Sequence, residues 1–304
     1  MSARSGEAGP PWIQHVPPIR QVSADRIVWI FGFGRSGTTW LASMMGDLPD
    51  HSMWNEPLVG ALFGDFYEVR NGDLRQSNFI LAPEHRSAWI NAIRYIVLTG
   101  AAARFPRLAE SGYLVIKEPH GCLGARFLTE ALPDSHMIVL VRDPRDVIAS
   151  HVDAQRTGSW TATTDHWKGR KKPVGAADSN PDAFVRHAAT EYVRSMEVVK
   201  QAYELHQGAK SLVKYEELRA NTLEVLLRMC SELMIPVARS EAERVVEHRS
   251  WHRIPPHKKG PGQFYRKGVP GAWREDLTHA QIQVVQEITQ PILEEFYAEE
   301  ASLT

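Results

Sequence analysis

The chain has 304 residues, of which 43% are hydrophobic and 23% charged, and its formal net charge at pH 7 is −1. This composition is that of a folded protein, and the near-zero charge excludes the overall basic field that would attract nucleic acid or a membrane surface. Two cysteines, Cys122 and Cys230, are too few for a disulfide framework and lack metal-ligand spacing. We therefore expect buried thiols in a reducing compartment, no metal site and no nucleic-acid partner.

The first residues, 1–24, are rich in Pro, Gly and Ala and lack the apolar core of a signal peptide. No apolar run approaches the ~18 residues that a membrane-spanning helix needs. We expect a cytoplasmic protein with no membrane span. The expected organisation is a flexible arm over 1–24 and a single domain over 25–304.

Short apolar runs rich in β-branched residues alternate along the chain with segments of helical periodicity. The first run, R-I-V-W-I-F at 26–31, predicts a buried parallel strand. After the third strand, Asp143 and Pro144 have the character of a helix N-cap and first helical residue. In chain order the sequence predicts a strand at 26–31, helices at 37–46 and 87–104, a strand at 113–117, a helix at 122–132, a strand at 136–141, helices at 144–154 and 181–207, a strand at 211–215, and helices at 223–233 and 279–299.

Strands that alternate with helices predict an α/β fold, a P-loop-like parallel sheet with helices on both faces. Ligands of such sheets bind outside the carboxyl ends of the strands. Polar clusters follow three of the predicted strands at those ends: after Phe31, at Lys117 and at Arg142. The segment 155–181 has no clear period, and its length inside a domain predicts a lid or an insert.

The loop G-F-G-R-S-G-T-T-W, from Gly32 to Trp40, joins the first predicted strand to the first helix. Its glycines allow a tight turn that brings backbone N–H groups and a helix N-terminus near an anion. The spacing nearly fits the nucleotide P-loop, but Thr38 stands in place of the lysine that reaches the β- and γ-phosphates. The pattern therefore predicts a phosphate cradle for a ligand other than ATP or GTP.

Two further motifs carry basic residues. The run H-M-I-V-L-V-R-D-P-R-D-V-I-A-S at 136–150 places Arg142 at a strand end and Ser150 two turns into the next helix, where both can bind a phosphate. Taken alone, Arg142 is better explained by a salt bridge to Asp143 or Asp146. The run R-K-G-V-P-G-A-W at 266–273 lies in a Gly/Pro-rich loop.

Together these motifs resemble sulfotransferases that use 3′-phosphoadenosine 5′-phosphosulfate (PAPS), in the family's order and over about 26–273. R-S-G-T-T-W resembles the loop for the donor's 5′-phosphosulfate, with Arg35 where many cytosolic members have lysine. The other two runs resemble the two parts of the 3′-phosphate site. The resemblance implies that PAPS, and its product 3′-phosphoadenosine 5′-phosphate (PAP), contact Arg35, Ser36, Gly37, Thr38, Thr39, Trp40, Arg142, Ser150, Tyr215, Ser250, Arg266, Lys267 and Gly268. Tyr215, Ser250 and Trp40 are the adenine contacts among these.

The resemblance also implies groups for the transfer. Lys117, in V-I-K-E-P-H, matches a lysine that touches the bridging oxygen or the sulfonate, and Arg35 can share that work without a metal. Glu56 stands where branches with R-S-G-T-T often have their glutamate base. His120 stands one position later than the histidine base of cytosolic branches. We favour Glu56 as general base, with His120 as acceptor-positioning group or alternative base.

The implied activity is in-line transfer of a sulfuryl group to a hydroxyl or amine of a small-molecule acceptor. Two alternatives are a P-loop nucleotide-dependent kinase and a non-catalytic nucleotide-sensing module. The kinase is disfavoured because Thr38 replaces the P-loop lysine, and the sensor because Lys117 and a candidate base are both present. Aromatic residues expected to wall the acceptor site are Phe63, Phe66, Tyr67, Phe79, Trp89, Trp160 and Trp167.

Overall fold

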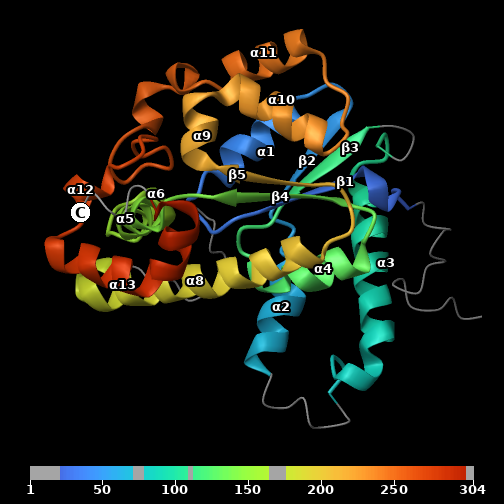
Figure 1. Ribbon diagram of the computed structural model, residues 1–304, viewed down its shortest axis with the longest axis horizontal. Coiled ribbons are helices and arrows are strands. Elements are labelled where there is room, and N and C mark those ends of the chain that lie inside the picture. Colours follow the sequence, from blue (N-terminus) through green and yellow to red (C-terminus); the bar gives the residue numbers. More distant parts are fainter. Residues whose placement is uncertain (1–20, 71–78, 109–111, 164–175, 299–304) are drawn as a thin grey trace, which may run out of the picture.

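A five-stranded parallel sheet in the order β2-β3-β1-β4-β5 lies at the centre of the molecule, as Figure 1 shows. The computed structural model describes residues 21–70, 79–108, 112–163 and 176–298, so that 1–20 of the expected arm lie outside it. The strands are β1 (Ile27–Phe31), β2 (His51–Asn55), β3 (Tyr113–Lys117), β4 (His136–Val141) and β5 (Lys210–Lys214). The predicted α/β fold is confirmed.

The sequence did not predict β2. Its residues, H-S-M-W-N, include no β-branched side chain, and the strand forms an edge of the sheet where only β3 pairs with it. The other strands lie within one residue of their predicted bounds. Tyr215 does not end a strand as expected, because it is the first residue of the helix α9.

Helices cover both faces of the sheet (Figure 1). Val28 and Ile30 of β1 pack on one face with α1, α9, α10 and α11, whereas Ile27, Trp29 and Phe31 pack on the other with the remaining long helices. This alternation buries every residue of β1. The helices are α1 (Thr38–Gly46), α2 (Val59–Val69), α3 (Arg86–Arg104), α4 (Ala125–Ala131), α5 (Pro144–Ala154), α6 (Trp160–Thr163), α7 (Ala176–Ser179), α8 (Pro181–Leu205), α9 (Tyr215–Ala220), α10 (Thr222–Glu232), α11 (Arg239–His248), α12 (Trp273–Asp276) and α13 (His279–Phe296).

The start of α5 confirms its predicted cap. The carboxylate of Asp143 accepts a hydrogen bond from the backbone N–H of Arg145 at 2.8 Å, and Pro144 is the first helical residue. Of the segment 155–181, the structure describes α6 and α7, while 164–175, including Trp167, lie outside the described residues. The sequence did not predict the helices α2, α6, α7, α9, α11 and α12.

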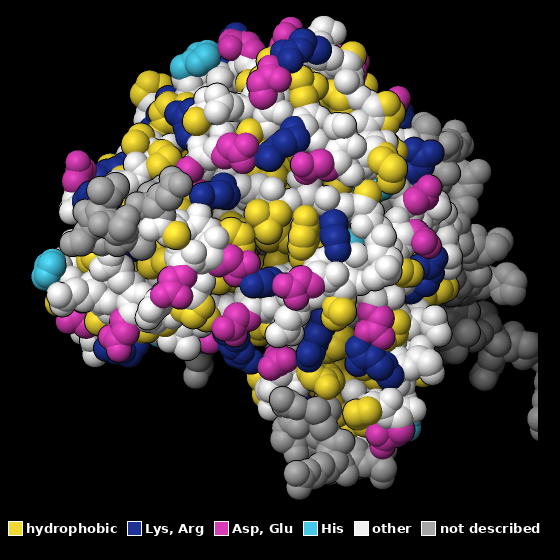
Figure 2. All heavy atoms as spheres, viewed as in Figure 1, with side chains coloured by type: hydrophobic (Ala, Val, Ile, Leu, Met, Phe, Trp, Pro, Cys, Tyr) yellow, Lys and Arg dark blue, Asp and Glu magenta, His cyan; other side chains and the backbone are white. Residues whose placement is uncertain are grey.

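The parallel register brings the strand ends together. Ile30 pairs with Lys117 and Phe31 pairs with Val139, so β1, β3 and β4 end at one edge of the sheet. None of the helices described combines the length and the apolar character that crossing a lipid bilayer requires. On the face shown in Figure 2, acidic and basic side chains lie intermingled. In sheets of this kind, ligands bind at the carboxyl edge, where β1, β3 and β4 end.

Candidate active site

The loop between β1 and α1 has the backbone geometry of an anion cradle. Gly37 (φ 96°) caps α1 without a side-chain hydrogen bond, and Arg35 (φ 69°) is also left-handed. A Cβ at Gly37 would lie 2.6 Å from the ring of Tyr215, so only glycine fits there. Since the first N–H groups of a helix have no partner within it, those of Thr38 and Thr39 are available to an anion.

Side chains of the same loop add polar groups. Ser36 is fully buried, and its hydroxyl has no hydrogen-bond partner among the described residues. The hydroxyl of Thr39 accepts a hydrogen bond from Nζ of Lys117 at 2.8 Å. A buried hydroxyl without a partner costs stability unless a ligand or water satisfies it. The hydroxyl of Ser36 is therefore an additional donor that a bound anion could satisfy.

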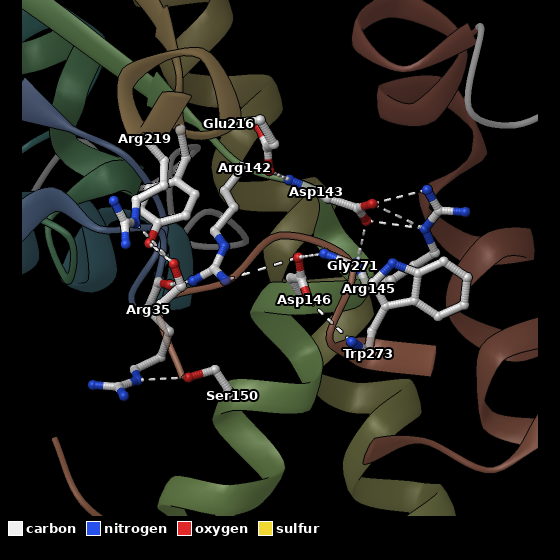
Figure 3. A network of polar contacts seen from close by, with 12 residues as sticks. Arg35, Arg142, Asp143, Arg145, Asp146, Ser150, Glu216, Arg219, Gly271 and Trp273 are labelled. Atoms are coloured by element: carbon white, nitrogen blue, oxygen red, sulfur yellow. Dashed lines mark hydrogen bonds and ion pairs between the residues drawn. The ribbon is translucent and has the colours of Figure 1, made fainter. Parts of the chain in front are cut away.

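Positive charge gathers beside this loop (Figure 3). Nε of Arg35 donates to the hydroxyl of Ser150 at 3.1 Å, and the carbonyl of Arg35 accepts from Nη1 of Arg142 at 3.0 Å. Burial, followed by repulsion from Arg142 and Arg266, lowers the pKa of Arg35 to about 10. The guanidinium remains charged at neutral pH, and a bound anion would relieve this repulsion.

Arg142 keeps hydrogen-bonding capacity. It is 7% exposed, and its Nε has no hydrogen-bond partner among the described residues. The alternative partners weighed from the sequence hold it weakly or not at all: Asp143 pairs with Arg145, and Oδ2 of Asp146 is 3.8 Å from Nη2 of Arg142. The guanidinium also lies 4.3 Å over the ring of Tyr215. Arg142 is thus a buried, positioned cation whose Nε can still donate a hydrogen bond to a ligand.

The two groups placed at the transfer step meet directly. Nζ of Lys117 lies 2.5 Å from Oε1 of Glu56, because β2 pairs with β3 so that Asn55 is opposite Lys117. Burial lowers the pKa of Lys117, and the charge of Glu56 opposes that shift. Nε2 of His120 lies 3.9 Å from the other oxygen of Glu56 and is more exposed. The two candidate bases, Glu56 and His120, therefore lie next to each other beside Lys117.

A cavity of about 360 Å³ joins these groups. Trp40 and Tyr215 line it, and Trp40 is fixed by a 2.9 Å hydrogen bond from its Nε1 to the carbonyl of Arg249. Ser250 does not line this cavity but a smaller one beside it, which shares Trp40 and Trp251. The hydroxyl of Ser250 donates to the carbonyl of Glu247 at 2.7 Å. Ser250 thus lies outside the larger cavity, in an adjoining one that Trp40 also lines.

Arg266, Lys267 and Gly268 line the cavity, as the sequence motif predicts, but the two cations have acidic partners. Nη1 of Arg266 lies 2.5 Å from Asp276, and Nζ of Lys267 lies 3.0 Å from both Asp276 and Glu275. A Cβ at Gly268 would lie 2.7 Å from the ring of Trp251. This loop is therefore tied to α12 through its charges.

The structure also brings to the cavity residues that sequence reasoning missed. Arg219, from α9, donates through Nε to the carbonyl of Gly268 at 3.1 Å, and Trp251 packs against that glycine. The guanidinium of Arg35 lies 5.1 Å over Phe264 and 5.5 Å over Trp160, of which only Trp160 was expected near the site. Position next to Ser250 was the only sequence signal for Trp251. None pointed to Arg219 or Phe264.

His151 is a further missed residue, next to Ser150 on α5. Its Nε2 lies 3.0 Å from the carbonyl oxygen of Gly34, and the side chain lines the cavity. Burial, followed by the charge of Arg35, lowers the pKa of His151 to about 4. The imidazole is therefore neutral at pH 7 and too weakly basic to serve as the general base.

The low pKa of His151 makes the stability of the protein depend on pH. Below the ordinary histidine pKa of about 6.5 the unfolded chain binds a proton that the folded chain binds only near pH 4. The free energy of unfolding should fall as pH drops from about 6.5 towards 4. Urea denaturation at pH 7 and pH 5 should show a smaller difference for His151→Gln than for the unsubstituted protein. An identical difference in both proteins would contradict the neutral state of His151.

Solved structures of sulfotransferases resemble this chain. The chain resembles mouse sulfotransferase SULT7A1 complexed with PAP at 15% identity, over 91% of this chain and 87% of that one, with a TM-score of 0.50. It resembles sulfotransferase STF9 from Mycobacterium avium at 14% identity, over 91% and 78%, with a TM-score of 0.53. It resembles the sulfotransferase domain from the curacin biosynthetic pathway at 16% identity, over 90% of this chain and 98% of that one, with a TM-score of 0.50. No curated protein sequence matches the chain.

At such low identities these structures establish the shared fold. The family assignment comes from the sequence itself, because the family model described as the sulfotransferase domain matches residues 25–297. That match includes the glycine loop, the strand ends and the basic loop at 266–273. The chain therefore belongs to the sulfotransferase domain family.

Proposed function

We propose that the chain transfers the sulfuryl group of PAPS to a hydroxyl or amine of a small-molecule acceptor by in-line displacement. The observation that carries this proposal is a single cavity that joins the glycine loop, the buried cation Arg142 and the Lys117–Glu56 pair. Group transfer from a nucleotide needs an anion site and a proton acceptor side by side. The PAP in the mouse sulfotransferase supports this choice of nucleotide.

The 5′ end of the donor fits the glycine loop. The N–H groups of Gly37, Thr38 and Thr39 would hold its phosphate at the N-terminus of α1, where the helix dipole favours negative charge. The unpartnered hydroxyl of Ser36 would donate a further hydrogen bond. Arg35 would leave the carbonyl of Phe264, to which its Nη2 donates at 2.7 Å, and turn to the sulfonate.

The 3′-phosphate fits between Arg142 and Ser150 on one side and the loop at 266–273 on the other. Arg142 offers its unpartnered Nε, and Ser150 its hydroxyl. Arg266 and Lys267 would share their charge between the phosphate and Asp276, with the backbone of Gly268 completing the loop. A doubly charged phosphate placed among these cations replaces mutual repulsion with attraction.

The adenine fits the aromatic end of the cavity. Trp40 and Tyr215 lie there with ring centroids 6.2 Å apart, and Trp251 lines the same wall. Because the planes of Trp40 and Tyr215 are at 69° to each other, the base would stack on one aromatic face of this wall and meet the edge of a neighbouring ring. Ser250, in the adjoining cavity, would contact the edge of the base.

At the other end Glu56 would remove the acceptor proton while the acceptor oxygen or nitrogen forms a bond to sulfur. The bond from sulfur to the 5′-phosphate oxygen breaks, and PAP leaves. Lys117 would donate to that leaving oxygen. Lys117 is ion-paired with Glu56 at 2.5 Å. When Glu56 takes up the acceptor proton, its carboxylate loses its charge, and the ammonium of Lys117 can then stabilise the leaving oxygen. His120, 3.9 Å from Glu56, would orient the acceptor or replace Glu56 as base.

The acceptor side of the cavity has apolar walls, among them Trp160 and Phe264, which suit a small molecule with an apolar body. We further propose that 25–304 acts as one domain, with 155–181 as a lid or insert. A cytoplasmic location belongs to the same proposal. It is supported by Cys122 and Cys230, which are both buried and free, as in proteins of reducing compartments.

A thermal-shift panel separates the transferase from the kinase alternative. PAP without Mg²⁺, at about 100 times its Kd, should stabilise the protein by about 2.7 kcal/mol, because it binds only the folded state. Mg-ATP at the same concentration should give no comparable shift. The reverse pattern would favour the kinase. Sulfuryl transfer from PAPS to a panel of phenols, sugars and amines then excludes the nucleotide-sensing module, which would bind PAP but turn over nothing.

The general base is tested by Glu56→Gln. This variant should lower kcat by about 10² or more, because an amide cannot accept the acceptor proton, and it should bind PAP like the unsubstituted protein. The matched variant is His120→Ala, which should retain more activity. A fully active Glu56→Gln protein beside an inactive His120→Ala protein would reverse the two assignments.

The 3′-phosphate site is tested by Arg142→Ala. Removal of a charged hydrogen bond should weaken PAP binding by about 1.5–3 kcal/mol in calorimetry. Arg239→Ala is the control, since Arg239 is exposed and pairs with Glu224 on the surface. Equal affinities for Arg142→Ala and the unsubstituted protein would remove Arg142 from the site.

A further inference from the structure

A single buried carboxylate joins the two segments that flank the proposed 3′-phosphate site. Asp146, in the first turn of α5, is fully buried. Its Oδ2 accepts a hydrogen bond from the backbone N–H of Gly271 at 2.7 Å, and its Oδ1 accepts from that of Trp273 at 3.1 Å (Figure 3). Asp146 therefore holds the end of the loop at 266–273 against the helix that follows β4.

Oδ2 of Asp146, which holds Gly271, also faces Arg142 of the proposed 3′-phosphate site. Oδ2 lies 3.8 Å from Nη2 of Arg142, which is four residues earlier and precedes the helix. At that distance the carboxylate attracts the guanidinium without occupying its hydrogen-bond donors. Asp146 is thus linked at once to Arg142 and to the loop that carries Arg266.

A buried carboxylate is costly unless its charge is compensated. Burial raises the pKa of Asp146, whereas Arg142 and the two N–H groups lower it. An amide or a hydroxyl could not accept both N–H groups in this way and would carry no charge to attract Arg142. The geometry therefore uses the carboxylate as a connector between two chain segments far apart in sequence.

Neighbouring contacts show that this loop is held at more than one point along its length. The guanidinium of Arg145 lies 4.3 Å over the ring of Trp273 and pairs with Asp143. In contrast, Val269 in the middle of the loop is 55% exposed. Gly271 has φ 80°, so the chain turns sharply at the residue whose N–H Asp146 holds. α5 thus holds the end of the loop at Gly271 and Trp273, whereas Tyr215 and Arg219 of α9 hold it at Gly268.

We propose that Asp146 is a positioning residue that fixes the loop at 266–273 relative to Arg142, so that both sides of the 3′-phosphate site are formed before the donor binds. This inference rests on the proposed function only in that the ligand is a nucleotide with a 3′-phosphate. Preformed sites bind more tightly because less ordering is left for the ligand to impose. Loss of Asp146 should therefore weaken donor binding and leave the chemical step intact.

The test is Asp146→Asn, which keeps the shape of the side chain but loses its charge and one acceptor oxygen. Calorimetry should show PAP binding about tenfold weaker, from the charge-assisted hydrogen bonds lost. The KM for PAPS should rise by about the same factor, with kcat and the acceptor KM within about twofold. Hydrogen exchange should become faster at the amides of Gly271 and Trp273.

Adenosine 5′-phosphate, which lacks the 3′-phosphate, localises the effect. Asp146→Asn should bind it as tightly as the unsubstituted protein does. Ile93→Ala controls for lowered stability, because Ile93 is buried on α3, an element that contributes no residue to the cavity. That variant should unfold more easily and bind PAP normally.

Two results would overturn the inference: unchanged PAP affinity in Asp146→Asn, or an equal loss of affinity for both nucleotides. Loss of PAP binding in Ile93→Ala would also overturn it, because stability alone would then explain the effect. If the unsubstituted protein itself bound no PAP, the proposed function would fail instead.

Discussion

Arg35 and Arg142 meet at the carboxyl edge of the sheet, and among the described residues neither has a carboxylate within hydrogen-bond distance. Burial lowers the pKa of Arg35, and repulsion from Arg142 lowers it further. Elsewhere on the described chain, buried cations such as Arg145 have a carboxylate partner at close range. An anion at this edge would remove the repulsion, and the adjacent glycine loop presents backbone N–H groups for the same purpose. The rest of the proposed site surrounds the position that such an anion would occupy.

The sheet explains how chemistry comes to stand beside this anion site. β1 supplies the glycine loop, β4 leads into Arg142, and β3 ends at Lys117, which the register places next to the end of β1. The edge strand β2 extends the row and delivers Glu56 to Lys117, where the backbone N–H of Glu56 donates to the carbonyl of Lys117 at 3.0 Å. Parallel pairing thus converts four distant stretches of sequence into one cavity.

Local chemistry was enough to predict much of this arrangement. The apolar runs identified four strands, and Asp143 with Pro144 identified the start of α5, because buried strands and helix caps depend on neighbouring residues. The edge strand β2 escaped prediction because its residues are partly buried or exposed and none of them is β-branched, so that no apolar run marks it. The contacts of Asp146 with the loop at 271–273 also escaped, since a link across 125 residues leaves no periodic pattern. The ion pair between Arg266 and Asp276 was missed because a run of charged residues does not reveal which opposite charge each residue contacts.

In the proposed binding mode the donor lies with its 5′ end on α1 and its 3′-phosphate beside α5. The most direct measurement is a crystal structure of the protein with PAP. We expect the 5′-phosphate within hydrogen-bond distance of the N–H groups of Gly37, Thr38 and Thr39, and the 3′-phosphate on Arg142 and Ser150. PAP bound in the opposite orientation, or outside the cavity that contains Lys117 and Glu56, would contradict the account.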